Sequence, residues 1–351
     1  MQNLQDLVGR VKAPNQDLAS QAQAHLDDLT KPRGALGRLE DLARQLVVIR
    51  GSLTLQAPKP AVAVFAADHG ICGSGVSAYP QEVTGQMVLN FLAGGAGINV
   101  ISRQNGAHVV VVDVGVISEF EELPGLLRKK VRPGTADFTQ QPAMTAEEAL
   151  AALNVGAEVA AELVNEGFDF LIPGDMGIGN TAASSALTAV LCGRPVDQVT
   201  GRGAGLDDAG LSKKAATLEA AIAARNPQAD DAFDVLCKVG GLEIAAIAGF
   251  CLEGAARGVP VLLDGFISSA GGLVAGKLCP TAVNYFLAGH RSVELGHTVQ
   301  LESLGLRPLL ELDMRLGEGS GAALALALVR AAVGIYNEMA TFSSAGISDK
   351  D

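Results

Sequence analysis

Aromatic residues are scarce in this sequence, and tryptophan is absent. Aromatics make up 4% of the 351 residues, whereas hydrophobic residues as a group make up 48%. A core without large rings must be filled by alanine, valine, leucine and isoleucine, which is the composition of helices packed closely on a parallel sheet. The composition therefore favours an α/β fold.

Basic residues are outnumbered by acidic ones: 26 Lys and Arg stand against 38 Asp and Glu, and the net charge is −12. Such a balance provides no basic face for nucleic acid or for an anionic membrane surface. The sequence instead favours small molecules as binding partners.

Closely spaced cysteines and long apolar runs are also missing. The five cysteines are far apart and form no CxxC motif, a pattern typical of buried thiols in a reducing compartment. The first residues, MQNLQDLVGRVKAPNQDLASQAQ, lack the apolar core of a secretory signal. Apolar runs such as AALALALV are shorter than the ~18 to 20 residues that span a bilayer. We therefore expect a cytoplasmic protein with no transmembrane segment.

Helical and strand patterns occupy different parts of the chain. Residues 3–50 have apolar positions three and four apart, with a break at KPRGALG. From residue 59 onward, Ala-rich segments separate short strand-like runs: AVAVFAADHG, HVVVVDVGV, FDFLIPGDMGIGN, VPVLLDGF and VNYFLAGH. This alternation predicts a Rossmann-like parallel sheet flanked by helices.

Two domains are expected. The sheet domain spans residues 56–315, and residues 1–55 with 316–351 form a small all-helical domain. The N-terminal helices carry too few apolar groups to stand alone, so they need the C-terminal helix as a partner.

Chemically useful residues follow several of the expected strands. In open α/β sheets, ligands bind outside the carboxyl ends of the strands. Glycine and aspartate are common in any turn, but five such loops at one edge indicate a site. A histidine after a strand and an aspartate is more often a structural tie than a catalyst, so Asp68 and His69 are interpreted as scaffold. The residues at the expected strand ends are Asp68, His69, Asp113, Gly115, Gly174 to Asn180, Asp264, Gly265, Gly289 and His290.

The segment GDMGIGNTAASSAL is the best candidate for an anion site. Its glycines allow backbone N–H groups to face a ligand, and Asn180 and Thr181 stand where the next helix should begin. The segment is neither a Walker A sequence nor a complete dinucleotide fingerprint. Lys213 and Lys214 could reach the same anion, or they could belong to a solvated face.

Glu318 lies between two glycines in RLGEGSGAALALALV, at the start of a run of Ala and Leu. Desolvation there would raise the pKa of the carboxylate toward that of a useful general base. Alternatively, the carboxylate could complement the dipole of the following helix.

Seven segments together resemble the nicotinate-nucleotide:5,6-dimethylbenzimidazole phosphoribosyltransferases: KPRGALGRLE, ADHGICGSGVSAYPQEVTGQMVLNFLAGGAGINV, GDMGIGNTAASSA, VTGRGAGLDD, VLLDGFISSA, GHRSVELGH and RLGEGSGAALAL. They follow one another in order from about residue 30 to 340. The resemblance implies phosphoribosyl transfer from nicotinate mononucleotide to 5,6-dimethylbenzimidazole or a related base in cobalamin biosynthesis. The products are α-ribazole 5′-phosphate and nicotinate. It also implies a homodimer and requires neither cofactor nor metal.

The chemistry of this transfer requires one general base. The departing pyridinium is already positive, whereas the incoming benzimidazole must lose its N–H proton as it bonds to C1′. The resemblance places that base at Glu318. It places the donor phosphate and ribose against Gly177, Gly179, Asn180, Thr181, Lys214, Ser292 and Gly317, and the acceptor base against Tyr79, Gln86, Met87 and Leu316.

Two positions depart from the family pattern. Asp175 stands where many relatives have glutamate, and Arg33 stands where a second proline is usual. Asp175 is the second catalytic candidate, although its side chain is one methylene shorter. Two alternatives stay open: a nucleotide-dependent oxidoreductase, and a catalytically silent protein that binds azoles or mononucleotides.

Overall fold

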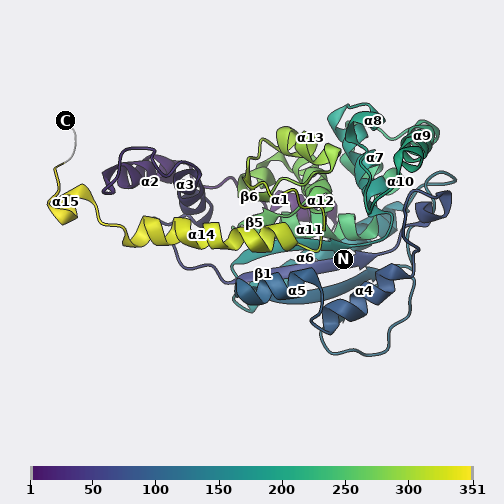
Figure 1. The fold of residues 1–351 in the computed structure, drawn as a ribbon, viewed down its shortest axis with the longest axis horizontal. Helices are drawn as coiled ribbons and strands as arrows, with labels where there is room; N and C mark the ends of the chain where they lie inside the picture. The colour runs from purple at the N-terminus through teal and green to yellow at the C-terminus, as the bar shows by residue number, and fades with distance from the viewer. Residues whose placement is uncertain (1–2, 349–351) are drawn as a thin grey trace.

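The computed structural model describes residues 3–348, so residues 1–2 and 349–351 of the expected helical domain lie outside the described part. Its centre is a seven-stranded parallel sheet with the order β3-β2-β1-β4-β5-β6-β7 (Figure 1). The expected Rossmann-like sheet is confirmed. The strands are β1 (Pro60–Ala67), β2 (His108–Gly115), β3 (Leu126–Arg128), β4 (Phe170–Met176), β5 (Val261–Leu263), β6 (Phe286–His290) and β7 (Pro308–Leu310).

Helices cover both faces of the sheet. One face carries α1 (Leu4–Gly9), α6 (Ala146–Asn165), α7 (Asn180–Cys192), α9 (Asp208–Arg225), α10 (Ala232–Val239), α11 (Leu242–Ala256), α12 (Phe266–Leu278) and the 3-10 helix η2 (Pro280–Tyr285). The other carries α2 (Asp17–Asp28), α3 (Arg38–Arg50), α4 (Val83–Leu92), α5 (Gly97–Gln104) and α14 (Ser320–Glu338). Shorter connections contain η1 (Gly70–Ser74), α8 (Val196–Val199), α13 (Leu295–Leu304) and α15 (Phe342–Ala345).

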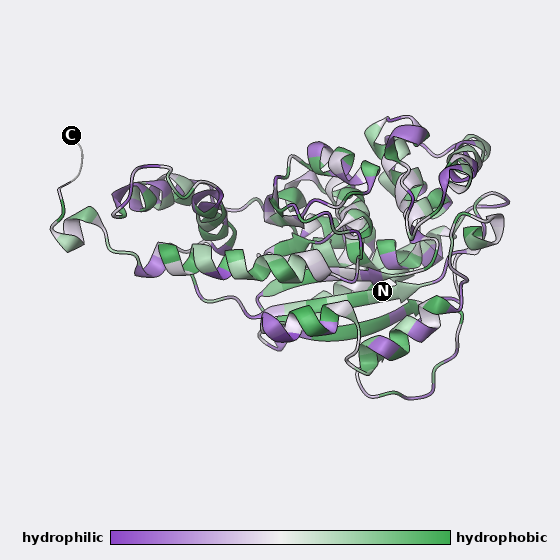
Figure 2. Cartoon of the chain, viewed as in Figure 1, coloured by the Kyte–Doolittle hydropathy of each residue, from purple (hydrophilic) through white to green (hydrophobic). Residues whose placement is uncertain are grey.

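The central strand β1 is buried on both sides. Phe65 packs with the α6 and α11 layer, whereas its neighbours Val64 and Ala66 pack with the α14 layer. Side chains of a strand alternate between its two faces, so a strand covered on both must be apolar throughout. Figure 2 shows the strands and the helices around them as mainly hydrophobic.

Helices from both ends of the chain form an arm beside the sheet. In Figure 1, α2, α3, the far half of α14 and α15 extend away from the strands. His25 is hydrogen-bonded to the Tyr336 carbonyl at 2.8 Å, and Leu29 forms an antiparallel bridge with Thr341. In contrast, α1 packs on α11 on the opposite face of the sheet, where Arg10 forms an ion pair with Glu253.

Five of the seven strands coincide with runs expected from the sequence. The other two, β3 and β7, have three residues each and lie on the two edges of the sheet. By length and composition alone, α14 could cross a membrane, but 56% of its apolar 18-residue stretch is buried in the protein. The core helix of a globular domain has the same properties.

Candidate active site

A cavity of about 370 Å³ opens at the carboxyl ends of the central strands. Its walls come from the segment before α4, the loop after β4, the segments that follow β5 and β6, and the segment before α14. It lies beside the point where the strand order reverses between β1 and β4, the usual ligand position in this type of sheet. The lining residues are Tyr79, Val83, Met87, Asp175, Met176, Gly177, Ile178, Asn180, Thr181, Gly203, Ala204, Gly265, Phe266, Ile267, His290, Ser292, Glu294, Arg315, Leu316, Gly317 and Glu318.

The Glu318 loop has an unusual backbone. Gly317, Glu318 and Gly319 have φ values of 85°, 65° and 90°, so three successive residues are left-handed. This conformation is disfavoured for a residue with a Cβ atom. Asp264 supports the end of the loop, since its carboxylate accepts hydrogen bonds from the Gly319 N–H at 3.2 Å and the Ala322 N–H at 2.9 Å.

Glu318 is 5% exposed and faces the cavity. Its Oε2 accepts a hydrogen bond of 3.0 Å from the Ile98 N–H in the first turn of α5. Burial raises the pKa of Glu318, the Ile98 hydrogen bond opposes this shift, and the charge of Asp264 adds to it. The carboxylate is therefore both oriented and made more basic, as a general base requires.

Asp175 lies at the end of β4 and is 6% exposed. Its Oδ2 accepts a hydrogen bond of 3.1 Å from Asn180 Nδ2, whereas its Oδ1 has no hydrogen-bond partner within the described part of the chain. Burial raises its pKa well above the ordinary value, and the charges of Asp264, Glu243 and Glu318 raise it further.

A buried lysine lies behind one corner of the cavity wall, at Thr181. Lys214 Nζ donates to Thr181 Oγ1 at 2.8 Å and to the Gly201 carbonyl at 3.3 Å. Burial lowers the pKa of Lys214 to about 8, although the charge of Glu294 opposes the shift. An ammonium group beside the first turn of α7 makes this corner suitable for a phosphate.

One buried histidine supports the segment after β6, and a second lines the cavity. His297 Nδ1 accepts a hydrogen bond of 2.9 Å from the Ser292 N–H, and its Nε2 lies 3.0 Å from Ser269 Oγ. Burial lowers the pKa of His297 to about 3, so this ring is neutral and holds Ser292 in place. The second histidine, His290, lines the cavity with its Nε2 3.5 Å from Asp264 Oδ1.

The fold brings most of the residues expected from the sequence to this cavity. Lys214 is not part of the wall, but its ammonium group reaches Thr181. Gly179 lies behind the wall, where an added Cβ atom would be 2.9 Å from Cys72 Sγ. Gln86 is exposed on α4 and does not line the cavity. The expected residues that line it are Tyr79, Met87, Asp175, Gly177, Asn180, Thr181, Ser292, Leu316, Gly317 and Glu318.

Several lining residues were not assigned to the site from the sequence. Glu294 and Arg315 occupy motifs that were recognised, but nothing in their spacing indicates which side chains face inward. Phe266 follows an expected strand end, and His290 was noted only as a strand-end residue. Within residues 3–348, no group of three histidine, cysteine or acidic side chains could hold a metal ion.

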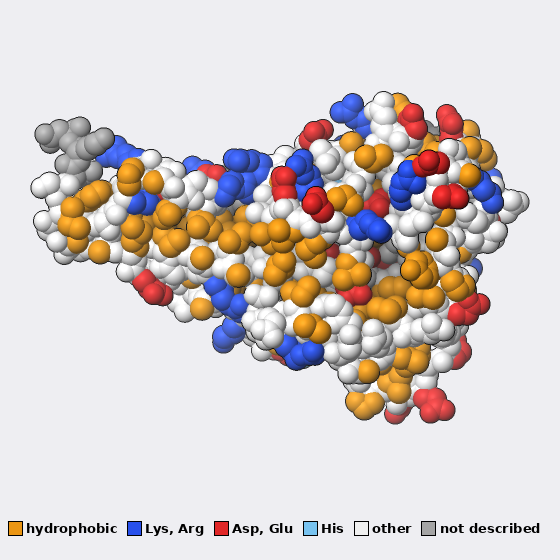
Figure 3. All heavy atoms as spheres, viewed as in Figure 1, with side chains coloured by type: hydrophobic (Ala, Val, Ile, Leu, Met, Phe, Trp, Pro, Cys, Tyr) orange, Lys and Arg blue, Asp and Glu red, His pale blue; other side chains and the backbone are white. Residues whose placement is uncertain are grey.

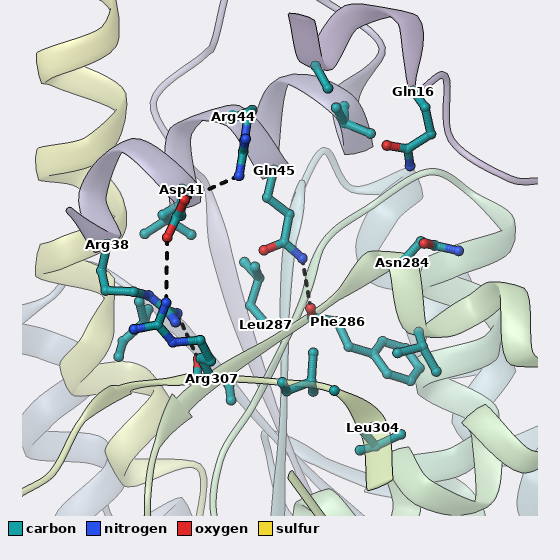
Figure 4. A pocket seen from close by; sticks show the side chains of 18 residues that line it. Gln16, Arg38, Asp41, Arg44, Gln45, Asn284, Phe286, Leu287, Leu304 and Arg307 are labelled. Atoms are coloured by element: carbon teal, nitrogen blue, oxygen red, sulfur yellow. Dashed lines mark hydrogen bonds and ion pairs between the residues drawn. The ribbon is translucent and has the colours of Figure 1, made fainter. Parts of the chain in front are cut away.

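A larger cavity, of about 780 Å³, lies between α3 and the beginnings of β6 and β7 (Figure 4). Arg38 donates to the Arg307 carbonyl at 2.8 Å, and Gln45 donates to the Phe286 carbonyl at 3.1 Å. Apart from Asp41, 49% exposed, no carboxylate lines this cavity among the described residues. It lies at the amino-terminal edge of the sheet and lacks a group suited to acid–base catalysis.

Comparisons with known proteins agree with the geometry. A family model described as phosphoribosyltransferase matches residues 11–347. The chain belongs to this phosphoribosyltransferase family. Two relatives named nicotinate-nucleotide–dimethylbenzimidazole phosphoribosyltransferase are similar over the whole chain. That of Chloroflexus aggregans is 51% identical over 350 residues, and that of Roseiflexus sp. is 52% identical; both alignments cover 100% of this chain and 99% of the relative.

The phosphoribosyltransferase also resembles solved structures. The crystal structure of CobT from Thermus thermophilus superposes with a TM-score of 0.92 at 50% identity, covering 95% of this chain and 100% of that one. The expected enzyme class, a phosphoribosyltransferase acting as a pentosyltransferase, is confirmed. The cavity has a buried carboxylate, Glu318, on its wall, and the Lys214 ammonium group contacts another wall residue, Thr181.

Proposed function

We propose that this enzyme transfers the 5-phosphoribosyl group of nicotinate mononucleotide to 5,6-dimethylbenzimidazole or a related base. The products are α-ribazole 5′-phosphate and nicotinate, which places the reaction in cobalamin biosynthesis. One observation carries the proposal. Buried Glu318 faces a cavity whose wall also includes Thr181, the residue that the Lys214 ammonium group contacts. The names and full-length similarity of the relatives support these substrates.

The donor phosphate binds at the cationic corner. The Lys214 ammonium group, bonded to Thr181 Oγ1, neutralises it, and the positive end of the α7 dipole at Asn180 adds to this attraction. Ser292, held by neutral His297, adds a hydroxyl donor, and the backbone of Gly177 and Gly317 lines the same cavity. Without this corner, the donor would lack a fixed position relative to Glu318.

The reaction is a single displacement at C1′ of the ribose. The glycosidic bond to nicotinate breaks and its electron pair returns to the pyridinium nitrogen, so this leaving group needs no proton. The benzimidazole nitrogen attacks from the opposite face, which converts the β-linked donor into an α-linked product. Glu318 accepts the N–H proton that the attacking ring must lose.

The acceptor base lies near an apolar wall. Tyr79, Met87 and Leu316 line the cavity close to the Glu318 loop, and both Tyr79 and Leu316 are more than half exposed in the single chain. Aromatic, thioether and aliphatic surfaces suit the two faces of a flat ring. The expected contact with Gln86 stays a prediction that requires the exposed α4 side chain to turn inward.

A homodimer in the cytoplasm is the proposed form of the enzyme. Figure 3 shows hydrophobic side chains gathered in a row over α14 and continuing toward the loops near the cavity. Exposed Leu89 on α4 and Val100 on α5 add to the apolar surface of the same layer. Covering such a surface favours association. The small helical domain then corresponds to the arm of α2, α3 and α14, without α1.

One assay separates the candidate functions. Enzyme, nicotinate mononucleotide and dimethylbenzimidazole are incubated, and free nicotinate and the new nucleotide are separated by chromatography. Equimolar formation of both products is expected. Binding of both ligands without turnover would favour a silent protein. A preference for NAD over nicotinate mononucleotide in calorimetry would favour an oxidoreductase.

A further inference from the structure

A completely buried ion pair lies beneath the loop that follows β4. His69 comes just after β1, and Glu243 lies in the first turn of α11. The distance between His69 Nε2 and Glu243 Oε1 is 2.6 Å, and both side chains are 0% exposed. Glu243 Oε2 and His69 Nδ1 have no hydrogen-bond partner within residues 3–348. Burying two ionisable groups is costly, so their position calls for a physical reason.

The pair is in contact with the glycines of the site. An added Cβ atom at Gly177 would lie 3.3 Å from His69 Nε2, and one at Gly179 would lie 3.2 Å from His69 Cβ. On the other side, a Cβ atom at Gly241 would lie 2.8 Å from Glu243 Oε2. The ion pair therefore fills the space between the β4 loop and the start of α11.

We propose that His69 and Glu243 are positioning residues that hold the loop from Gly177 to Gly179, at the end of β4, and present the carboxyl group of Asp175 to the bound nucleotide as a neutral hydrogen-bond donor. The inference rests on the proposed function, because the oxygen that accepts this hydrogen bond belongs to the bound nicotinate mononucleotide. It gives the Asp175 carboxyl group a role distinct from that of the Glu318 base.

The surrounding charges favour a protonated Asp175. Glu243 on α11, Asp264 after β5 and Glu318 before α14 face it with negative charge, whereas Asn180 is the neutral group that donates to it. Burial and these carboxylates raise its pKa well above the usual range. A protonated carboxyl group carries an O–H donor, and Asp175 Oδ1 is the oxygen that has no partner among the described residues.

Glu243 favours the protonated form of His69. Burial opposes protonation of His69, but the charge and hydrogen bond of Glu243, with a smaller contribution from the charge of Asp68, outweigh burial and raise its pKa. The imidazolium thus compensates Glu243, while Glu243 still acts on Asp175. Without the charge of Glu243, the pKa of Asp175 would be raised less.

The test is the pH dependence of kcat/KM for nicotinate mononucleotide in the wild type, Glu243→Gln, Asp175→Asn and the double variant. Glu243→Gln keeps the shape but removes the charge. In the wild type, kcat/KM should fall at alkaline pH as Asp175 loses its proton. In Glu243→Gln this fall should occur at a pH lower by about one unit, the order expected for the loss of one nearby charge. Asp175→Asn keeps a neutral donor and should lack that fall. In this background Glu243→Gln should cause no further pH shift.

Glu253→Gln is the matched control, because Glu253 is another buried, ion-paired glutamate of α11. It lies at the opposite end of the helix from Glu243, where it binds Arg10 and Arg257. Its pH profile should follow the wild type even if its thermal stability falls. An equal shift in Glu253→Gln, or an unshifted fall in Glu243→Gln, would overturn the proposal.

A spectroscopic measurement is independent of turnover and of how well Glu243→Gln folds. The infrared difference spectrum of wild type minus Asp175→Asn at pH 7 should contain the carbonyl stretch of a protonated carboxylic acid. Only carboxylate bands would mean that Asp175 is ionised, and the inference would be wrong even if the enzyme is an active phosphoribosyltransferase. Conversely, an acid band in a protein without transferase activity would support a protonated Asp175 and refute the proposed function.

Discussion

Gly174 on β4 lies directly against the backbone of Glu318. A Cβ atom at position 174 would be 2.7 Å from the Glu318 carbonyl carbon and even closer to its carbonyl oxygen. The left-handed loop that carries the proposed base therefore rests on a strand position where only hydrogen fits. The sheet and the catalytic loop are coupled through this contact.

Gly174→Ala should displace the Glu318 loop. Overpacking of a buried contact costs about 1–3 kcal/mol of folding free energy, and the displaced carboxylate should lower kcat more than it raises KM. Gly73→Ala is the matched control, since no atom lies within 4 Å of an added Cβ atom there. Thermal unfolding and initial rates of both variants check the prediction; equal behaviour of the two would contradict it.

Glu318→Gln should reduce turnover by roughly 10² to 10⁴, the usual contribution of a general base, with little change in binding of nicotinate mononucleotide. Burial raises the pKa of Glu318, so the wild-type rate should rise with pH through that shifted value and reach a plateau. The variant should lack this rise. If Glu318→Gln keeps nearly wild-type activity, or if it unfolds, the Glu318 carboxylate has a structural role and is not the base.

Lys214→Met should weaken binding of nicotinate mononucleotide roughly ten- to a hundredfold, the contribution of a hydrogen bond to a charged group. Burial lowers the pKa of Lys214 to about 8, so wild-type affinity for the free enzyme should fall as pH rises through that value. Lys213→Met is the control, because Lys213 is exposed. Calorimetry at several pH values measures both; equally small effects would mean that Lys214 does not bind the donor phosphate.

Asp175→Asn should stabilise the protein against heat at alkaline pH. In the folded protein, burial raises the pKa of Asp175 well above its ordinary value, whereas the unfolded chain ionises near ~3.9. Between these values the unfolded state binds fewer protons, so wild-type stability from this group decreases as pH rises. The melting temperature of the variant should exceed that of the wild type at pH 8, and the gap should close near pH 4. A gap independent of pH would contradict a raised pKa.

The sequence by itself determined the α/β layers and the edge of the sheet that carries the site. Strand β1 is apolar at every position and β4 ends in a glycine-rich loop, so a buried parallel sheet with ligands at its carboxyl edge follows from local pattern. The segment around Glu318 was identified because a charge between two glycines before an Ala and Leu run is unusual. By contrast, the edge strands β3 and β7 are only partly buried, so they lack the fully buried apolar run that marks β5 at the same length of three residues.

Only the tertiary structure decided how charges combine. Glu243 lies 174 residues from His69, and Ile98 lies 220 residues from Glu318, yet each pair is joined by a hydrogen bond. Such contacts depend on which faces of distant helices meet, and neither residue of a pair indicates the other by type or spacing. Burial and neighbouring charge set the ionisation of Asp175, Lys214 and Glu318, and both are properties of the packed fold rather than of the local sequence.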